Sequence, residues 1–285
     1  MIANKEILKK IKHISPISQS AVQILRLTNG PDYSLREIVR IIECDSVLTA
    51  NILKVANSAS FSPRNIITSI DLAVSFLGER IIISTALNVC SKQFFKGSLE
   101  GYESQKGELW THSLQTAIAA RCLAKKSKGH PINANLAFTG GILHDIGKPV
   151  LSFLLNGTAE KFIAEIDARE QEDYLSAERT KLGIDHCEAG FALAEHWNLP
   201  EPYREIIKMH HSPKDATPEV AHLCYAVHVA DIIAMMSGAG TGADCLQYRL
   251  DPGFSSYFQV TEDDLSEIIL SVDIEYKKIE SSLRN

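Results

Sequence analysis

Five histidines and two aspartates occur along the chain in an order that suggests one shared site. They are His112, the pair His144 and Asp145 in LHDIGK, His186 in GIDHCEAG, the pair His210 and His211 in KMHHSP, and Asp231 in VHVADIIAMM. Both aspartates stand among apolar residues, where burying an unpaired carboxylate is costly. Imidazole nitrogens and carboxylate oxygens together suit divalent Fe, Mn, Zn, Ni or Co. The set is large enough for two such ions with one aspartate shared between them.

The chemistry that such a site favours is the hydrolysis of a phosphate ester. Two ions roughly 3.5–4 Å apart activate a water and hold the oxygens of the phosphate. Lys148 follows His144 by one predicted helical turn and would stabilise the charge that develops on the phosphate. We therefore predict Asp145 and Lys148 as the catalytic residues.

Each of these residues also has a structural interpretation. A single histidine on a helix, such as His112 or His186, is more often an ordinary core or surface residue. The adjacent pair at 210 and 211 would also suit the capping of a helix end, and Asp231 would also suit a pairing with His228. The order of the whole set favours metal ligands. A structural interpretation is kept for the remaining histidines, which are His13, His130, His196, His222 and His228.

The elements that must position these residues are helices. Apolar residues recur at helical spacing through most of the chain, for example Ile17, Ala21, Ile24 and Leu25, and strand-like alternation is nearly absent. Two pairs, Ser34 with Glu37 and Thr68 with Asp71, are predicted capping boxes. Long helices are predicted over residues 108–126, from 131 through 148, over 220–236 and over 263–281. The predicted fold class is all-α, a multi-helix bundle with an N-terminal helical subdomain.

A polar stretch over residues 96–107 is the best candidate for a domain boundary. It predicts an N-terminal helical subdomain over 1–100, a helical subdomain with the metal site over 101–240, and a C-terminal linker and helix over 241–285. In the first of these, Asp45 and Asn57 have two interpretations, as part of a recognition surface or as residues that cap and end helices. The structural interpretation is favoured, because such residues commonly serve caps and turns.

Composition excludes several classes of protein. The chain has 285 residues, 45% of them hydrophobic, and six cysteines without a CxxC pair, which indicates a reducing compartment and no disulfide scaffold. No apolar run approaches the roughly 18 residues of a membrane span. The net charge of −6 argues against nucleic acid as a bulk partner. The first 13 residues are charged and amphipathic rather than a signal peptide, so we expect a cytoplasmic protein.

The ordered motifs resemble those of a known family. LHDIGK within the series H…HD…H…HH…D is similar to the HD-domain superfamily of metal-dependent phosphohydrolases. The segments SLREIVRIIECDSVLTANILKVANSASF and ITSIDLAVSFLGERII are similar to the HDOD family, the HD-related output domains of bacterial signalling proteins. The resemblance covers about residues 14–211, and the HD-type helices extend it to about 236.

The resemblance implies a bundle of HD type and two divalent metal ions. HDOD domains are similar to the HD-GYP phosphodiesterases, whose metal ligands correspond to His112, His144, Asp145, His186, His210, His211 and Asp231, with Lys148 on the substrate phosphate. It also implies a third ion at Glu108, one turn before His112. The GYP segment is absent after HHSP, which argues against cyclic di-GMP as the substrate.

Two functions therefore stand. In the first, His112, His144, Asp145 and Asp231 hold one ion, Asp145, His186, His210 and His211 hold the other, and the protein hydrolyses a nucleotide or another phosphoester. In the second, the chain is a non-catalytic signal-output or scaffold domain that binds a signalling protein, with the metal structural. A metal site whose entrance is open to solvent favours the first function. An entrance blocked by Trp110, Met209 or the N-terminal half favours the second.

Overall fold

A computed structural model of the chain describes residues 2–15, 17–30, 33–90, 95, 97–127 and 131–284. This part of the chain folds into helices joined by turns and two isolated β-bridges, which confirms the all-α prediction. No helix within the described ranges is long and apolar enough to cross a membrane.

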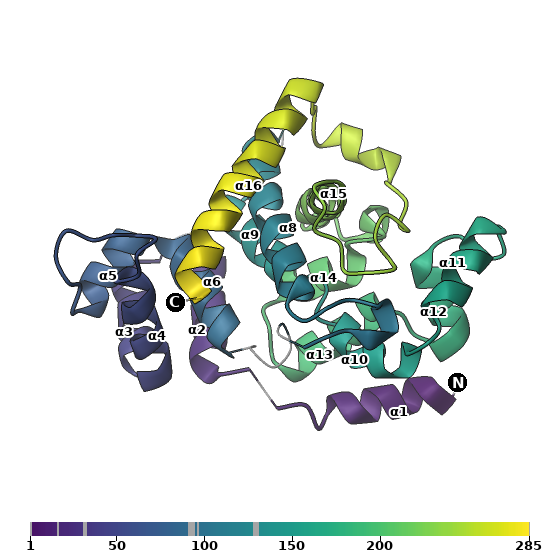
Figure 1. The fold of residues 1–285 in the computed structure, drawn as a ribbon, viewed down its shortest axis with the longest axis horizontal. Helices are drawn as coiled ribbons and strands as arrows, with labels where there is room; N and C mark the ends of the chain where they lie inside the picture. Colours follow the sequence, from purple (N-terminus) through teal and green to yellow (C-terminus); the bar gives the residue numbers. More distant parts are fainter. Residues whose placement is uncertain are drawn as a thin grey trace.

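The helices of the first part of the chain lie at the left of Figure 1, apart from α1. They are α1 (Ile2–Ile11), α2 (Gln19–Asn29), α3 (Leu35–Glu43), α4 (Ser46–Ala56), α5 (Ile70–Leu77) and α6 (Glu79–Cys90). The capping box of Ser34 and Glu37 is confirmed at the start of α3. The predicted box at Thr68 and Asp71 is wrong, because Ser69 caps α5 through its hydroxyl.

The remaining helices follow from residue 108 onward. They are α8 (Glu108–Ala124), α9 (Ala134–Leu143), α10 (Lys148–Ser152), α11 (Ala159–Asp167), α12 (Tyr174–Leu182), α13 (His186–His196), α14 (Glu201–Met209), α15 (Ala221–Met236) and α16 (Glu262–Arg284). Short 3₁₀ turns lie at Glu100–Tyr102, Phe153–Leu155, Pro213–Asp215 and Pro252–Ser256.

Helix α8 is the central helix of this part of the chain and packs against α9, α15 and α16 (Figure 1). It is buried on nearly every side, as expected of a helix without a polar face. Small residues let its backbone come close to α9. A Cβ atom on Gly141 would lie 2.5 Å from the Cα atom of Ala117.

The prediction of one helix from Pro131 to Lys148 is wrong. Helix α9 begins after its cap Asn133 and ends at Leu143, and residues 144–147 form a turn before α10. The turn packs its backbone against α13, because a Cβ atom on Gly147 would lie 1.8 Å from the carbonyl oxygen of His186. A regular helix continued through Gly147 would not reach this contact.

Two elements connect the halves of the chain. Helix α1 lies beside α13 and α10, along the lower edge of Figure 1. Helix α16 packs on α8 and forms ion pairs from Glu275 to Arg80 of α6 and to Arg121 of α8. The division at residues 100 and 240 stays a prediction, and Lys96 at the proposed boundary lies outside the described residues.

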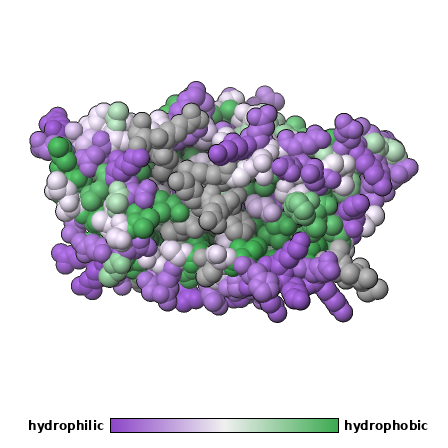
Figure 2. All heavy atoms as spheres, turned by 60° about the horizontal axis from the view of Figure 1, so that its bottom comes forward, coloured by the Kyte–Doolittle hydropathy of each residue, from purple (hydrophilic) through white to green (hydrophobic). Residues whose placement is uncertain are grey.

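The hydrogen bonds of Asp45 and Asn57 support the interpretation of these residues as helix caps and turn residues. The Asp45 side chain accepts hydrogen bonds from the Val47 and Leu48 amides at the start of α4. The Asn57 side chain exchanges two hydrogen bonds of 2.8 Å with the backbone of Ile67. On the face drawn in Figure 2, hydrophilic residues are interspersed with smaller hydrophobic areas, as on most folded proteins.

The close contact between α8 and α9 yields a test. We expect Gly141→Ala to lower the free energy of unfolding by about 2 kcal/mol or more, because the new methyl group meets the backbone of Ala117. Gly140→Ala is the matched control. Its methyl group would meet only side-chain atoms of Ile206 and Val227, which can shift. Urea denaturation followed by circular dichroism measures both, and equal midpoints would contradict the backbone contact.

Candidate metal centre

Four of the predicted residues converge between α8, α15 and the turn after α9. The Nε2 atom of His112 lies 3.0 Å from Oδ1 of Asp231, 3.5 Å from Oδ2 of Asp145 and 3.2 Å from Nε2 of His144. The Nε2 atom of His144 is 3.4 Å from Asp145 Oδ2 and 3.7 Å from Asp231 Oδ1. All four side chains are buried. We call His112, His144, Asp145 and Asp231 the first cluster.

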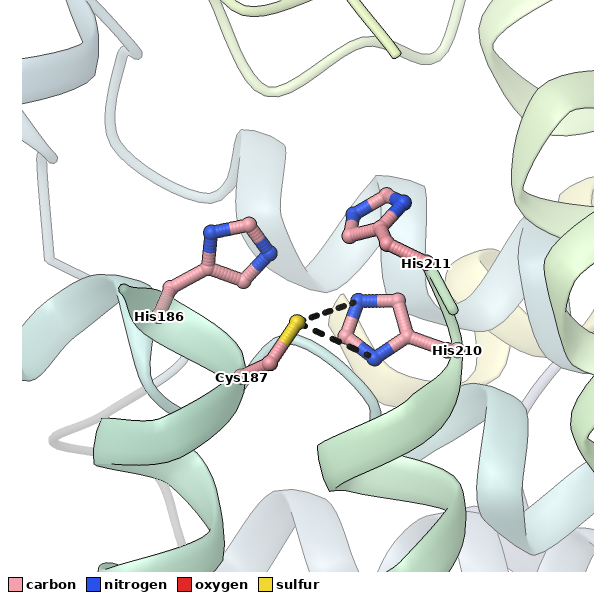
Figure 3. A group of neighbouring side chains, drawn as sticks. All are labelled: His186, Cys187, His210 and His211. Carbon is pink, nitrogen blue, oxygen red and sulfur yellow. Dashed lines mark hydrogen bonds between the residues drawn. The ribbon is translucent and has the colours of Figure 1, made fainter. Parts of the chain in front are cut away.

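A second group meets the other oxygen of Asp145. His186 is the first residue of α13, and His210 and His211 directly follow α14. The Nε2 atoms of His186 and His210 lie 3.6 and 3.7 Å from Asp145 Oδ1. Figure 3 shows the three histidines extending from the two helix ends toward one another. We call Asp145, His186, His210 and His211 the second cluster.

These distances match the spacing of ligands around a metal ion. Two donor atoms bound at about 2.0–2.2 Å to one ion lie roughly 3.0–3.6 Å apart at angles near 90–110°. The Oδ1 atom of Asp145 and the Nε2 atom of His186 are buried without a hydrogen-bond partner, while the Oδ2 atom of Asp145 has the Lys148 ammonium at 2.7 Å. Such orphaned acceptors are costly unless a cation satisfies them. The residues therefore fit two divalent ions that share Asp145.

Hydrogen bonds from Nδ1 to backbone carbonyls fix the orientation of three of the imidazole rings. The Nδ1 atom of His112 donates to the Ala239 carbonyl at 2.6 Å, and that of His144 donates to the Gly141 carbonyl at 2.8 Å. The Nδ1 atom of His210 donates to the Ile207 carbonyl at 2.9 Å. With the proton held on Nδ1, each Nε2 presents a lone pair to the centre, which is the usual arrangement of metal-binding histidines. The capping interpretation of His210 is thus correct for one of its nitrogens and leaves the other free to bind metal.

Glu178, on α12, orients His186 and was not identified from the sequence. Its Oε2 atom accepts hydrogen bonds from the backbone amide of His186 at 2.8 Å and from its Nδ1 atom at 2.9 Å. Its Oε1 atom accepts from the Tyr102 hydroxyl at 2.6 Å. Glu178 and Tyr102 are both fully buried. Glu178 is the only acidic residue of its helix, but no local pattern in the sequence indicates that it faces His186.

The charge balance also favours a cation. Burial alone would lower the pKa of His144, but the carboxylates of Asp145 and Asp231 raise it to about 10. Burial would raise the pKa of Asp145, but the neighbouring His144 and Lys148 hold it well below its usual range. Burial lowers the pKa of His210 to about 4. The Lys148 ammonium, 2.7 Å from Asp145, balances one of the two aspartates, and either a proton on His144 or a metal ion would supply the further positive charge.

Lys148 lies beside the centre and is also buried. Its ammonium group is 2.7 Å from Asp145 Oδ2 and 2.6 Å from Asp244 Oδ2, and it donates to the Thr241 hydroxyl at 2.9 Å. Asp244 and Thr241 belong to the predicted C-terminal linker, to which the sequence assigned no part in the site.

Tyr248 covers the second cluster. Its ring stacks on that of His211 with the centroids 4.0 Å apart, and its hydroxyl donates to Asp244 at 2.6 Å. Both nitrogens of His211 are without a hydrogen-bond partner, and burial lowers its pKa. Trp110, one of the residues whose position over the site would favour the signal-output function, packs against Phe95.

Cys187 lies beside the histidines of the second cluster. Its Sγ atom is 3.8 Å from both ring nitrogens of His210 (Figure 3). With His186, His210 and His211 it forms a group whose ligand atoms all lie within 4.8 Å of one another, close enough to hold a metal ion. Cys187 was not predicted from the sequence as part of the site, and burial raises the pKa of its thiol.

Other predicted residues are engaged elsewhere. Glu108 accepts hydrogen bonds from the Gln105 amide and the Ser104 hydroxyl at the start of α8, and the third ion stays a prediction. His228 bonds the His210 carbonyl and the Asp251 amide, rather than pairing with Asp231. The Nε2 atom of His196 bonds the Ile14 carbonyl, while His130 lies outside the described residues.

Comparison with known proteins gives a family match. The HDOD domain family model matches residues 14–213. An uncharacterized protein of Treponema pallidum (strain Nichols) is 27% identical over 221 residues, which are 76% of this chain and 42% of that protein. The chain thus spans less than half the length of this relative.

Two solved structures are similar across this chain. One, from Marinobacter aquaeolei VT8, is named "Putative signal transduction protein" and has a TM-score of 0.77 with 17% identity over 99% of this chain and 65% of its own. The other, from Shewanella amazonensis SB2B, is named "Putative metal-dependent phosphohydrolase" and has a TM-score of 0.55 with 24% identity over 99% of this chain and 100% of its own. At these identities the similarity shows a shared fold.

Metal content tests the two clusters. We expect the chain purified without chelators to hold about two equivalents of a transition metal, and Asp145→Ala to lose most of it, because both clusters share this carboxylate. Elemental analysis by mass spectrometry measures the content. His196→Gln is the control, since this half-buried histidine contacts Ile14. A folded Asp145→Ala variant with the metal content of the wild type would contradict the shared site.

The role of Glu178 yields a second test at this site. We expect Glu178→Gln to weaken metal binding by roughly 10- to 100-fold, because the amide cannot hold the proton of His186 on Nδ1 as firmly as the carboxylate does. Competition with a chromophoric chelator measures the affinity. Glu188→Gln is the control, because Glu188 belongs to the capping box at the start of α13. Equal losses in the two variants would indicate a general effect on the helix.

Proposed function

This chain belongs to the HDOD domain family, and on that premise we propose that it is a metal-dependent phosphohydrolase. The substrate would be a nucleotide or another phosphoester, cleaved as by a phosphodiesterase. The observation that carries the proposal is the shared carboxylate of Asp145, whose two oxygens face separate groups of imidazole Nε2 atoms.

The ligand sets follow from the geometry of the clusters. The first cluster would hold one ion and the second cluster the other, with Asp145 common to both. Two bound ions supply a Lewis acid for the phosphate oxygens and a water of lowered pKa for the attack. Asp145 would fix the position of the two ligand groups relative to each other, because its oxygens are 3.4–3.7 Å from imidazoles of both.

Lys148 would provide the positive charge for the phosphate. Although burial lowers the pKa of its ammonium group, Asp145 and Asp244 raise it above the ordinary value, so the group stays protonated at neutral pH. A fixed ammonium in a buried site stabilises developing negative charge more strongly than one in water. Its position next to Asp145 directs this charge toward a phosphate bound between the clusters.

A signal-output function is the second candidate, and one observation favours it. Tyr248 stacks on His211 and Lys148 is already surrounded by oxygens, so the described side chains restrict access to the centre. In this function the metal would stabilise the fold, and the chain would act by binding a signalling protein.

Hydrolysis by protein of known metal content separates the two candidates. We expect the chain loaded with Mn²⁺ to hydrolyse bis(4-nitrophenyl) phosphate and Asp145→Ala to be slower by roughly 100-fold or more. Dialysis against EDTA should abolish the activity, and adding Mn²⁺ back should restore it. The His196→Gln protein serves as the control for purification.

A fully loaded chain that hydrolyses neither this diester nor a panel of nucleotides would contradict the enzymatic proposal. The same chain with two equivalents of metal bound and no activity would support the signal-output function.

A further inference from the structure

The ammonium group of Lys148 has no side left open for a ligand. An ammonium has three N–H groups, and three oxygens lie within hydrogen-bonding distance of it. These are Asp145 Oδ2 at 2.7 Å, Asp244 Oδ2 at 2.6 Å and Thr241 Oγ1 at 2.9 Å. A phosphoester can contact Lys148 only if one of these oxygens gives up its place.

Of the two carboxylates that accept from Lys148, Asp244 is the one that can be replaced without disturbing the clusters. Asp145 faces both clusters, where its oxygens are required. Asp244 contacts neither cluster, and its carboxylate has other partners, because it accepts hydrogen bonds from the Thr241 hydroxyl at 2.8 Å and from the Tyr248 hydroxyl at 2.6 Å. It would therefore remain partnered when the ammonium turns to another anion.

The backbone around Asp244 holds this carboxylate against the site. The amide of Ala243 donates to the Tyr102 carbonyl at 2.7 Å, and the amide of Tyr174 donates to the Gln247 carbonyl at 3.2 Å. Residues 241–248, which we call the C-terminal strap, also bring Tyr248 onto His211. The strap lies beyond residues 14–213 that match the family.

We propose that Asp244 is a built-in competitor that occupies the place of a phosphate on Lys148, so that the strap is autoinhibitory. This inference rests on the proposed role of Lys148 as the group that binds phosphate. A carboxylate and a phosphate present the same chemistry to an ammonium, two anionic oxygens at hydrogen-bonding distance. Binding of a phosphoester to Lys148 then requires that the incoming anion replace Asp244. Any partner or ligand that moves the strap away from Lys148 would raise the affinity of the site for phosphoester.

The opposite role for Asp244 is the alternative that the experiment must exclude. A carboxylate beside Lys148 would also serve to position the ammonium, as buried ion pairs often do. A positioning residue helps the ligand to bind, whereas a competitor hinders it. Removing the charge of Asp244 therefore changes phosphate affinity in opposite directions in the two cases.

Calorimetric titration of inorganic phosphate into the full chain loaded with Mn²⁺ is the test. We expect Asp244→Asn to bind phosphate about tenfold or more tightly than the wild type, because the competing state no longer reduces the binding-competent fraction. Asp273→Asn is the matched control. It removes one carboxylate from an exposed ion pair with Lys277 on α16, and its phosphate affinity should equal that of the wild type.

Lys148→Met separates this inference from the proposed function. Loss of phosphate binding in Lys148→Met together with tighter binding in Asp244→Asn supports both. If Lys148→Met loses phosphate binding but Asp244→Asn binds phosphate as the wild type does or more weakly, the role of Asp244 as a competitor is overturned and that of Lys148 is not. Phosphate binding by Lys148→Met at the wild-type affinity overturns the role of Lys148, and the competitor with it.

Metal content and thermal unfolding are measured on each variant before titration. Asp244→Ala, which removes both the charge and the contacts of the side chain, replaces Asp244→Asn if the latter does not fold, and the same tighter binding is expected. If neither variant folds with its metal, the inference is overturned, since a contact that the fold cannot lose cannot be exchanged for phosphate.

Discussion

The structure depends on the burial of one carboxylate among imidazole groups. Asp145 is 1% exposed, its Oδ1 atom has no hydrogen-bond partner, and its Oδ2 atom is paired with the Lys148 ammonium at 2.7 Å. A charge in this position is tolerated only when several positive or metal-binding groups surround it. Here four imidazole Nε2 atoms from α8, α13 and the ends of α9 and α14 lie within 3.4–3.7 Å of its oxygens. The packing of these elements is thus tied to the chemistry of the centre.

Close approach of backbones makes this convergence possible. The turn that carries His144 and Asp145 lies directly against α13, where Gly147 leaves no room for a side chain. Gly141 brings α9 onto α8 in the same way. Both contacts use small residues to bring polar groups from separate helices to one point, and the apolar core around them keeps water out. A methyl group at either position would separate the clusters.

The groups that contact the histidines and Lys148 determine how the centre can bind its ligands. Glu178 and three backbone carbonyls hold protons on Nδ1 and so direct Nε2 inward. The C-terminal strap supplies Asp244 to Lys148 and Tyr248 to His211. The centre is therefore prepared to bind metal, while its cation for phosphate is already paired. If the proposed function is correct, access to the centre is the quantity that a signal would change.

The sequence by itself determined the helical fold, the capping box at Ser34 and the seven residues that meet at the centre, because periodicity, caps and residue order are local properties. It did not determine the turn at residues 144–147, which depends on contact with α13. Only the tertiary structure brought Glu178 to His186 and Asp244 to Lys148. The latter two residues are nearly a hundred positions apart, and an acidic residue in a linker has no local pattern that indicates such a partner. Contacts of this kind are decided when the helices pack, since burial makes the pairing of each charge obligatory.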